Sequence, residues 1–207
     1  MRKLYWFAIW AVSSFILAVP ANAATDMASV VAATYGSFSL SAPTPSLVAI
    51  CHGFGCKHRV EVALNDGDRA ALARLMAAGN ASAASERRAV AAAGAWFDRR
   101  IAPSAGTKGH MARAGYQHAF DAGQFDCIDA SRNTTSLLLV LEQLHLLRHH
   151  DIEEPVARGY LIDGRPPHVT AVLSERGNGK QWAVDSWTRG YGQPFEIMPL
   201  SVWQTVD

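Results

Sequence analysis

The chain has 207 residues, 49% of them hydrophobic and 18% charged, with 19 Lys and Arg against 18 Asp and Glu. This near-neutral balance, in a sequence with no Lys/Arg-rich stripe or tail, argues against a nucleic-acid-binding protein and against a polybasic membrane-surface protein. The length suits one domain that is large enough to bury a hydrophobic core.

The first 23 residues are organised like a bacterial Sec-type signal peptide. Two basic residues precede an apolar run over residues 4–19, and the sequence ANA at 21–23 has the small-x-small form of a signal peptidase site. A membrane anchor is the alternative, but the run is short for a span and the cleavage site follows it directly. We therefore expect residues 1–23 to be removed, leaving a periplasmic or secreted protein without a stable membrane span.

The next part of the chain predicts an arm, a strand and two helices. Residues 24–49 are rich in Ser, Ala, Thr and Pro and are expected to form an irregular arm before a single domain at 50–207. HRVEVAL at 58–64 alternates like a strand. A helix is predicted over 65–79, and a second over 85–103, capped by its first serine and ended by its proline.

Two of the three cysteines lie in CHGFGCKH at the start of the domain. Its two glycines let the backbone turn tightly enough to bring the sulfurs of Cys51 and Cys56 together. A local disulfide is the favoured interpretation for an exported protein. The alternatives are two buried thiols, or a metal site that adds His52 and His58 but matches no well-attested zinc spacing.

The second half of the domain predicts one helix followed by an antiparallel meander. A Gly/Ala-rich loop at 104–124 leads into a helix beginning at Cys127, whose apolar body should be buried against a sheet. Three strands follow, over 155–163, 166–175 and 180–187. Helices first and a meander afterwards indicate an α+β fold.

The start of the Cys127 helix combines a cysteine with two acids. Asp126 occupies the place of an N-cap, and Asp129 that of the acidic partner in a capping box. Cys127 would then lie in the first turn, where free N–H groups and the helix dipole favour a thiolate. If Cys51 pairs with Cys56, Cys127 is the leftover thiol. The plainer alternative is that Cys127 is a small buried hydrophobic residue.

A thiol nucleophile needs a base within hydrogen-bond reach and a group that orients the base. His168 opens one predicted strand and Asp185 lies in the next. A turn centred near Gly177 places residue 168 opposite 186. Because the sequence locates the centre of the turn only approximately, His168 and Asp185 can be cross-strand neighbours on one face. An incidental pair at a strand end is the alternative.

Other residues are weaker candidates. For an oxyanion hole, the N–H of Cys127 could be joined by the amide of Gln124, while Trp187 is a candidate for the cleft wall. Of the remaining histidines, those at 145, 149 and 150 are interpreted as surface or C-cap residues, whereas His110 and His118 lie in the 104–124 loop.

The order Cys127, His168, Asp185 on a helix start and two neighbouring strands, with the DCID start, resembles the bacterial transglutaminase-like cysteine proteinases of the papain-like superfamily. The resemblance covers residues 85–187. It implies a papain-like or transglutaminase-like α+β core with the Cys helix packed on an antiparallel sheet. It also implies that Cys127 is the nucleophile, His168 the general base and acid, and Asp185 the orienting carboxylate.

The resemblance implies a periplasmic thiol peptidase or amidase that acts on a peptide or protein through an acyl-enzyme on Cys127. Members of the family usually carry an acid directly after the cysteine, tied in some to calcium. Ile128 stands at that position, which argues against dependence on calcium without excluding it, and no other cofactor is expected. Two alternatives stay open: a non-catalytic binding or scaffold protein of the same fold, and a metal-binding protein using CHGFGCKH.

Overall fold

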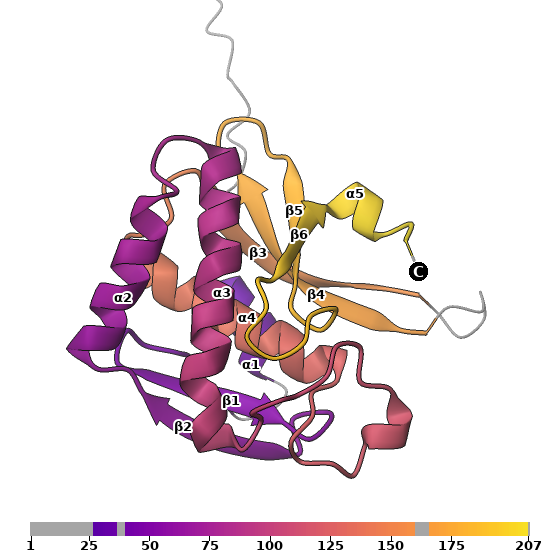
Figure 1. Ribbon diagram of the computed structural model, residues 1–207. Helices are drawn as coiled ribbons and strands as arrows, with labels where there is room; N and C mark the ends of the chain where they lie inside the picture. The colour runs from indigo at the N-terminus through magenta and orange to yellow at the C-terminus, as the bar shows by residue number, and fades with distance from the viewer. Residues whose placement is uncertain (1–26, 37–39, 160–165, 207) are drawn as a thin grey trace, which may run out of the picture.

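The computed structural model describes residues 27–36, 40–159 and 166–206, and within them it has the expected α+β architecture (Figure 1). The helices are α1 (Met27–Tyr35), α2 (Asp66–Ala77), α3 (Ala83–Ala105), α4 (Cys127–Gln143) and α5 (Leu200–Trp203), with a short 3-10 turn, η2, at Tyr116–His118. The strands are β1 (Leu47–His52), β2 (His58–Ala63), β3 (His150–Arg158), β4 (His168–Glu175), β5 (Gln181–Asp185) and β6 (Glu196–Pro199). The predicted signal peptide at 1–23 lies outside the described residues.

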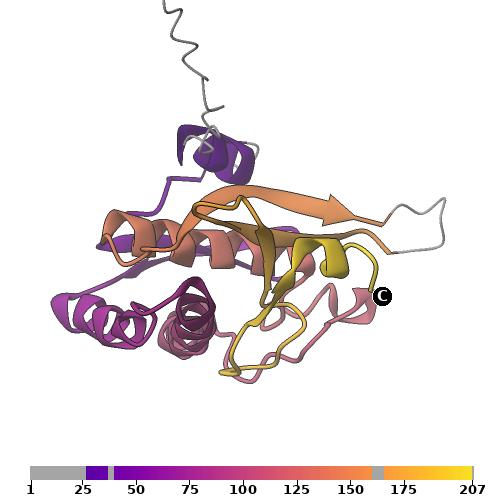
Figure 2. The ribbon, with the colours of Figure 1, turned by 90° about the horizontal axis from the view of Figure 1, so that it is seen from above.

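Helix α4 is the centre of the core. It packs against β4 of the four-stranded sheet and against β1 of the β1–β2 hairpin. Figure 2 shows α1 on one side of this assembly and the α2–α3 pair on the other. The five consecutive residues 137–141 are all fully buried. A helix covered on every face can be apolar all round, as the sequence predicts.

The larger sheet is an antiparallel meander in the order β3-β4-β5-β6. Strand β3 begins at His150, earlier than the strand predicted over 155–163, and it runs to Arg158. Residues 160–163 of the prediction lie outside the described residues. The register of β3 with β4 shifts between Glu153 and Val156, around Pro155. Proline has no N–H to donate to a neighbouring strand. Because β3 is at the edge of the sheet, the strand continues through Pro155 with a shift in register instead of beginning at this residue.

The segment at 24–49 is more regular than predicted. Helix α1 packs on β3 and α4, and β1 already begins at Leu47. Tyr35 is buried at the end of α1 and its hydroxyl hydrogen-bonds the Ser136 hydroxyl of α4 at 2.7 Å. This segment therefore contributes to the core instead of only leading to it.

The ends of α2 and α3 differ slightly from prediction. Helix α2 has a capping box in which Asn65 is the N-cap. In α3 the N-cap is Ser82, and Ser85, the predicted cap, is its partner three residues later. Pro103 does not end α3, because a proline in the last turn removes only one late hydrogen bond; the helix stops at Gly106, which has a φ of 69°.

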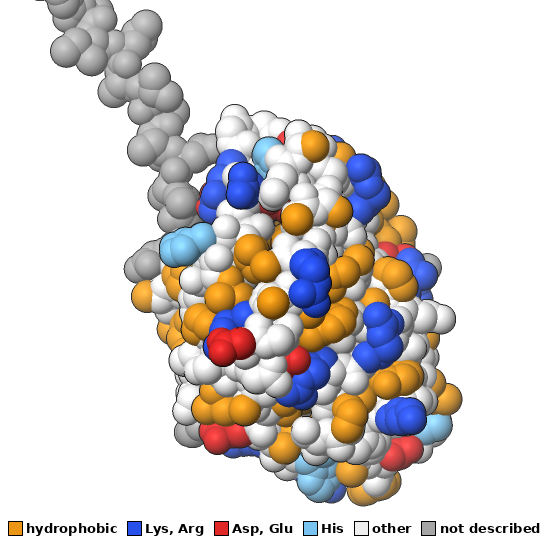
Figure 3. Space-filling model, turned by 60° about the vertical axis from the view of Figure 1, so that its left-hand side comes forward, with side chains coloured by type: hydrophobic (Ala, Val, Ile, Leu, Met, Phe, Trp, Pro, Cys, Tyr) orange, Lys and Arg blue, Asp and Glu red, His pale blue; other side chains and the backbone are white. Residues whose placement is uncertain are grey.

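In the part of the chain that the structure describes, no helix is both long and apolar enough to cross a membrane. Figure 3 shows the face turned forward from the left-hand side of Figure 1. On this face the basic side chains lie apart from one another, with apolar side chains between them. The face therefore carries no continuous basic stripe.

Candidate functional site

The start of α4 has the capping geometry that the sequence predicts. The side chain of Asp126, the N-cap, accepts a hydrogen bond from the backbone N–H of Asp129, and the Asp129 carboxylate accepts one from the N–H of Asp126. Cys127 is the first residue of the helix and is half-buried. Its sulfur is thus held in the first turn of a helix whose body is fixed in the core.

His168 and Asp185 form a buried pair. His168 Nε2 lies 2.6 Å from Asp185 Oδ2, and the two side chains are only 6% and 2% exposed. The observed register pairs Ala171 with Val184, so Asp185 lies opposite Thr170 and on the same face as His168. The cross-strand pair that the sequence allows is therefore present in the fold.

Further donors fix the Asp185 carboxylate and the His168 ring. Trp203 Nε1 donates to Asp185 Oδ2 at 2.8 Å, and the backbone N–H of Trp187 donates to Asp185 Oδ1 at 3.1 Å. The two indole rings also contact the imidazole, with centroids 4.7 Å (Trp187) and 5.3 Å (Trp203) from it. With Nε2 on Asp185, His168 Nδ1 is left buried and without a hydrogen-bond partner in the described structure. Nδ1 is thus the ring nitrogen that can exchange a proton with another group.

Cys127 and His168 line the same cleft, which has a volume of about 570 Å³. The sulfur of Cys127 lies beside the strand that carries the imidazole, 3.9 Å from the carbonyl oxygen of Pro167. Most of the other lining side chains are apolar: Phe54, Ala114, Tyr116, Ile128, Ala157, Pro166, Pro167, Val169 and Trp187. The cleft therefore offers one thiol and one imidazole in a largely apolar setting.

The resting thiol is protonated at neutral pH, contrary to the prediction from its helix position. Burial raises the pKa of Cys127 to about 11, and the charges of Asp126 and Asp185 add to this effect. A hydrogen bond from the backbone of Val169 lowers the pKa without outweighing them. Desolvation thus overrides the helix dipole, whose effect on a terminal charge is modest.

The two weaker candidates lie in different places. Trp187 lines the cleft, as predicted. Gln124 is not among the residues that line it; its side-chain oxygen accepts the N–H of Met111, and its carbonyl accepts the N–H of Gly53. Gln124 therefore ties the loop before α4 to its neighbours.

Cys51 and Cys56 form a disulfide, with their Cα atoms 4.5 Å apart, and Cys127 is free. Such a bond is typical of proteins in oxidising compartments. Although the two sulfurs and the Asp129 carboxylate lie within 4.8 Å of one another, disulfide sulfurs are not the thiolates that a metal site requires. His52 instead stacks against His58 and hydrogen-bonds the carbonyl of Ala122, so the four residues of the alternative metal site have other partners.

Two other histidines are buried against acids. His110 pairs with Asp98 at 3.0 Å, beside a small cavity separate from the thiol cleft. His150, interpreted from the sequence as a surface or C-cap residue, is fully buried and bonds Glu86 at 2.9 Å. Glu86 also accepts hydrogen bonds from the backbone N–H groups of residues 148 and 149. These contacts hold the segment after α4 against α3 and explain why His150 is buried.

Sequence reasoning missed two sets of contacts at the site, the first being the hydrogen bond from Trp203 to Asp185. Trp203 lies in the C-terminal tail, and nothing local in the sequence links it to Asp185. The contacts of Asp126 and Asp129 with the disulfide loop were missed as well, although the glycines of CHGFGC signal a turn with exposed N–H groups. No protein-family model, curated protein or solved structure matches this chain.

Proposed function

We propose that the protein is a thiol hydrolase that cleaves a peptide or side-chain amide through an acyl-enzyme on Cys127. The observation that carries the proposal is the cleft shared by Cys127 and His168, in which Asp185 holds one nitrogen of the imidazole and leaves the other unbonded. A nucleophile, a base and a group that orients the base are the parts that this chemistry needs.

His168 acts as a general base during attack. Because the thiol of Cys127 has a pKa of about 11, its proton has to leave as the sulfur attacks, and His168 Nδ1 accepts it while the S–C bond forms. Asp185 stabilises the imidazolium produced. The same proton then passes to the leaving amine as the C–N bond breaks, giving a thioester.

Water completes the cycle. It attacks the thioester carbon and gives a proton to His168, and the C–S bond breaks to release a carboxylic acid. The proton returns from the imidazolium to the sulfur of Cys127. The oxyanion formed in each step lies at the start of α4, where the N–H of Cys127 has no intrahelical acceptor and can donate to it.

The largely apolar lining of the cleft favours a substrate with an apolar side chain near the scissile bond. Tyr116, Ile128 and Val169 are among the residues that line the cleft, and the Tyr116 residue is 84% exposed, which leaves its ring available to a ligand. An uncharged, apolar side chain would lose least solvation there.

The test is hydrolysis of a mixture of peptides by the purified protein, followed by mass spectrometry. We expect cleavage of peptides. When the reaction is stopped with acid, we also expect an acyl group bound to the peptide of the protein that contains Cys127. The variant Cys127→Ala should give neither product, while Cys127→Ser tests whether a hydroxyl can replace the thiol. Binding of peptides without cleavage by both the wild type and Cys127→Ala would favour the scaffold alternative.

A further inference from the structure

The disulfide loop, residues 51–56, has an unusual backbone. Four consecutive residues have a positive φ: Gly53 (77°), Phe54 (69°), Gly55 (66°) and Cys56 (60°). Two of the four are not glycine, and residues with a side chain rarely adopt this conformation. The disulfide between Cys51 and Cys56 closes the loop and reduces the number of backbone conformations that the loop can adopt.

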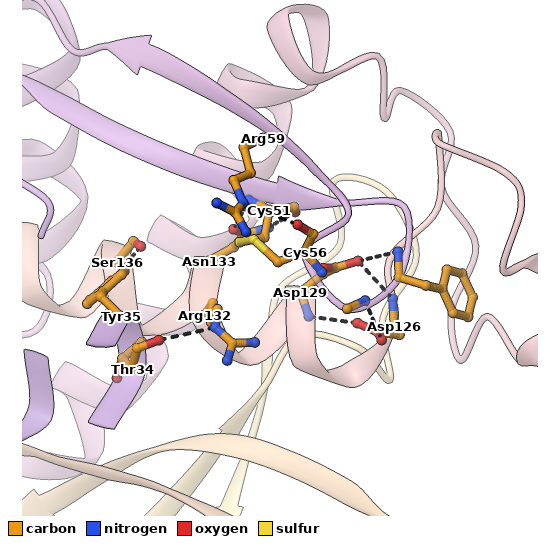
Figure 4. The surroundings of a disulfide bond; sticks show 12 residues. Thr34, Tyr35, Cys51, Cys56, Arg59, Asp126, Asp129, Arg132, Asn133 and Ser136 are labelled. Carbon is orange, nitrogen blue, oxygen red and sulfur yellow. Dashed lines mark hydrogen bonds between the residues drawn. A yellow bond between two sulfur atoms is a disulfide. The ribbon is translucent and has the colours of Figure 1, made fainter. Parts of the chain in front are cut away.

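The carboxylates at the start of α4 bind the N–H groups of this loop (Figure 4). Asp129 Oδ1 accepts from the N–H of Cys56 at 2.6 Å, and its Oδ2 accepts from the N–H of Phe54 at 2.8 Å. Asp126 Oδ2 accepts from the N–H of Gly55 at 2.8 Å. Successive N–H groups in a tight turn form a concave site for anions, and here the anions belong to the helix that carries Cys127.

A side chain one turn further along α4 holds the other end of the same loop. The Asn133 amide accepts from the N–H of Cys51 at 2.9 Å and donates to its carbonyl oxygen at 2.8 Å. Helix and loop are thus joined at both ends of the disulfide, across more than 70 residues of sequence.

Asp129 depends on these donors. It is fully buried, and burial together with the neighbouring charge of Asp126 raises its pKa to about 7. The N–H groups of Cys56 and Phe54 oppose that rise. A buried acid that loses its donors is costly to keep charged, so opening of the loop would disturb the first turn of the helix.

We propose that Asp129 is a positioning residue for Cys127: it fixes the first turn of α4 to the loop closed by Cys51 and Cys56, so that the reaction of the thiol with His168 as base requires the disulfide. This inference rests on the proposed function, because it concerns the same thiol. A dithiol reductant would open the loop. It transfers two electrons and two protons to the Cys51–Cys56 disulfide, which becomes two thiols while the dithiol becomes a disulfide.

The test measures the rate of alkylation of Cys127 by iodoacetamide, site by site with mass spectrometry, across a range of pH. Asp129→Asn and the double variant Cys51→Ser/Cys56→Ser should each lower the rate at neutral pH by about tenfold, as expected for losing hydrogen bonds to a charged group. Asp68→Asn is the matched control, because Asp68 is the corresponding acid in the capping box of α2. It should leave the rate unchanged.

A purely structural role is separated from positioning by a double-mutant cycle with His168→Ala. If Asp129 acts by aligning the thiol with His168, Asp129→Asn should slow the wild type but not the His168→Ala protein. Equal slowing in both backgrounds, at temperatures where circular dichroism shows the fold intact, would overturn the inference. A wild type no faster than His168→Ala would instead contradict the proposed function itself.

A second measurement does not depend on any variant folding. Wild-type protein is treated with dithiothreitol until mass spectrometry shows Cys51 and Cys56 reduced. The alkylation rate of Cys127 is measured before reduction, in the reduced protein and after reoxidation. We expect the rate to fall and then recover. An unchanged rate in the fully reduced protein would refute the link between disulfide and thiol.

Discussion

Replacing His168 by Ala gives the most direct test of its role as a base, because the pKa of Cys127 predicts how slowly the thiol should react without one. A pKa of about 11 leaves about one thiol in 10⁴ ionised at pH 7, since each pH unit below the pKa lowers the ionised fraction tenfold. A free cysteine, with a pKa of about 8.5, has about 3% thiolate at that pH. Without a base, Cys127 should therefore be alkylated more than 100-fold more slowly than a small thiol.

The sign of the pH dependence follows from the same value. In His168→Ala the rate should rise about tenfold for each pH unit and level off only near pH 11, because the thiolate alone reacts. In the wild type, His168 accepts the proton during attack, so the rate at neutral pH should be higher and should depend less steeply on pH. In the assay, alkylation is stopped after a series of times, and mass spectrometry measures the alkylated fraction of the peptide that contains Cys127. Superimposable curves for the two proteins would refute the assignment of His168 as base.

Four further predictions concern the stability of the fold, the His168–Asp185 pair and dependence on calcium. Gly94→Ala should lower the free energy of unfolding by about 1–3 kcal/mol in urea titrations, because the new methyl group would overlap the ring of Phe195. Ser82→Ala should lower the free energy of unfolding by about 1 kcal/mol in the same assay, because the α3 cap is lost. Trp203→Phe should destabilise the fold by about 1–3 kcal/mol, because it removes an indole donor from buried Asp185, and should reduce peptide cleavage more than Ser82→Ala does. Treatment with EGTA should leave the alkylation rate of the thiol unchanged; a loss restored by calcium would contradict this expectation.

The sequence contains most of the local information that builds the site. The capping box at Asp126 and Asp129 could be predicted because the residue types required at a helix start are few and act over three residues. The disulfide between Cys51 and Cys56 could be predicted because two glycines in a short loop permit the approach. In both cases the partners are close in sequence, so no knowledge of the tertiary fold was needed.

The register of β4 and β5 marks the limit of such reasoning. A turn centred near Gly177 predicts that paired residue numbers sum to 354, whereas the observed pairs, such as Ala171 with Val184, sum to 355. One residue of slip moves every side chain to the opposite face of a strand. The observed register puts Asp185 on the face of His168, and the predicted centre alone would have put it on the other.

Long-range burial sets the properties that the sequence could not supply. The pKa of Cys127 depends on how deeply β4 and the cleft wall cover the first turn of α4, and this outweighs the dipole that favours a thiolate. His150 was misplaced for a related reason: its acid partner, Glu86, lies 64 residues away in α3. Neither environment has a signature in the neighbouring residues.

The inventory of oxygens around Cys127 bears on calcium. The resembled family has an acid where this chain has Ile128, and each carboxylate oxygen of the two acids that remain accepts a backbone hydrogen bond. Asp126 Oδ1 accepts from the N–H of Asp129 and its Oδ2 from that of Gly55, while the oxygens of Asp129 accept from the loop. Calcium takes six to eight oxygen ligands, and these carboxylates could supply only a few of them, from oxygens that already accept backbone hydrogen bonds. Backbone N–H groups of the loop closed by the disulfide thus stabilise the charges of these two carboxylates beside Cys127.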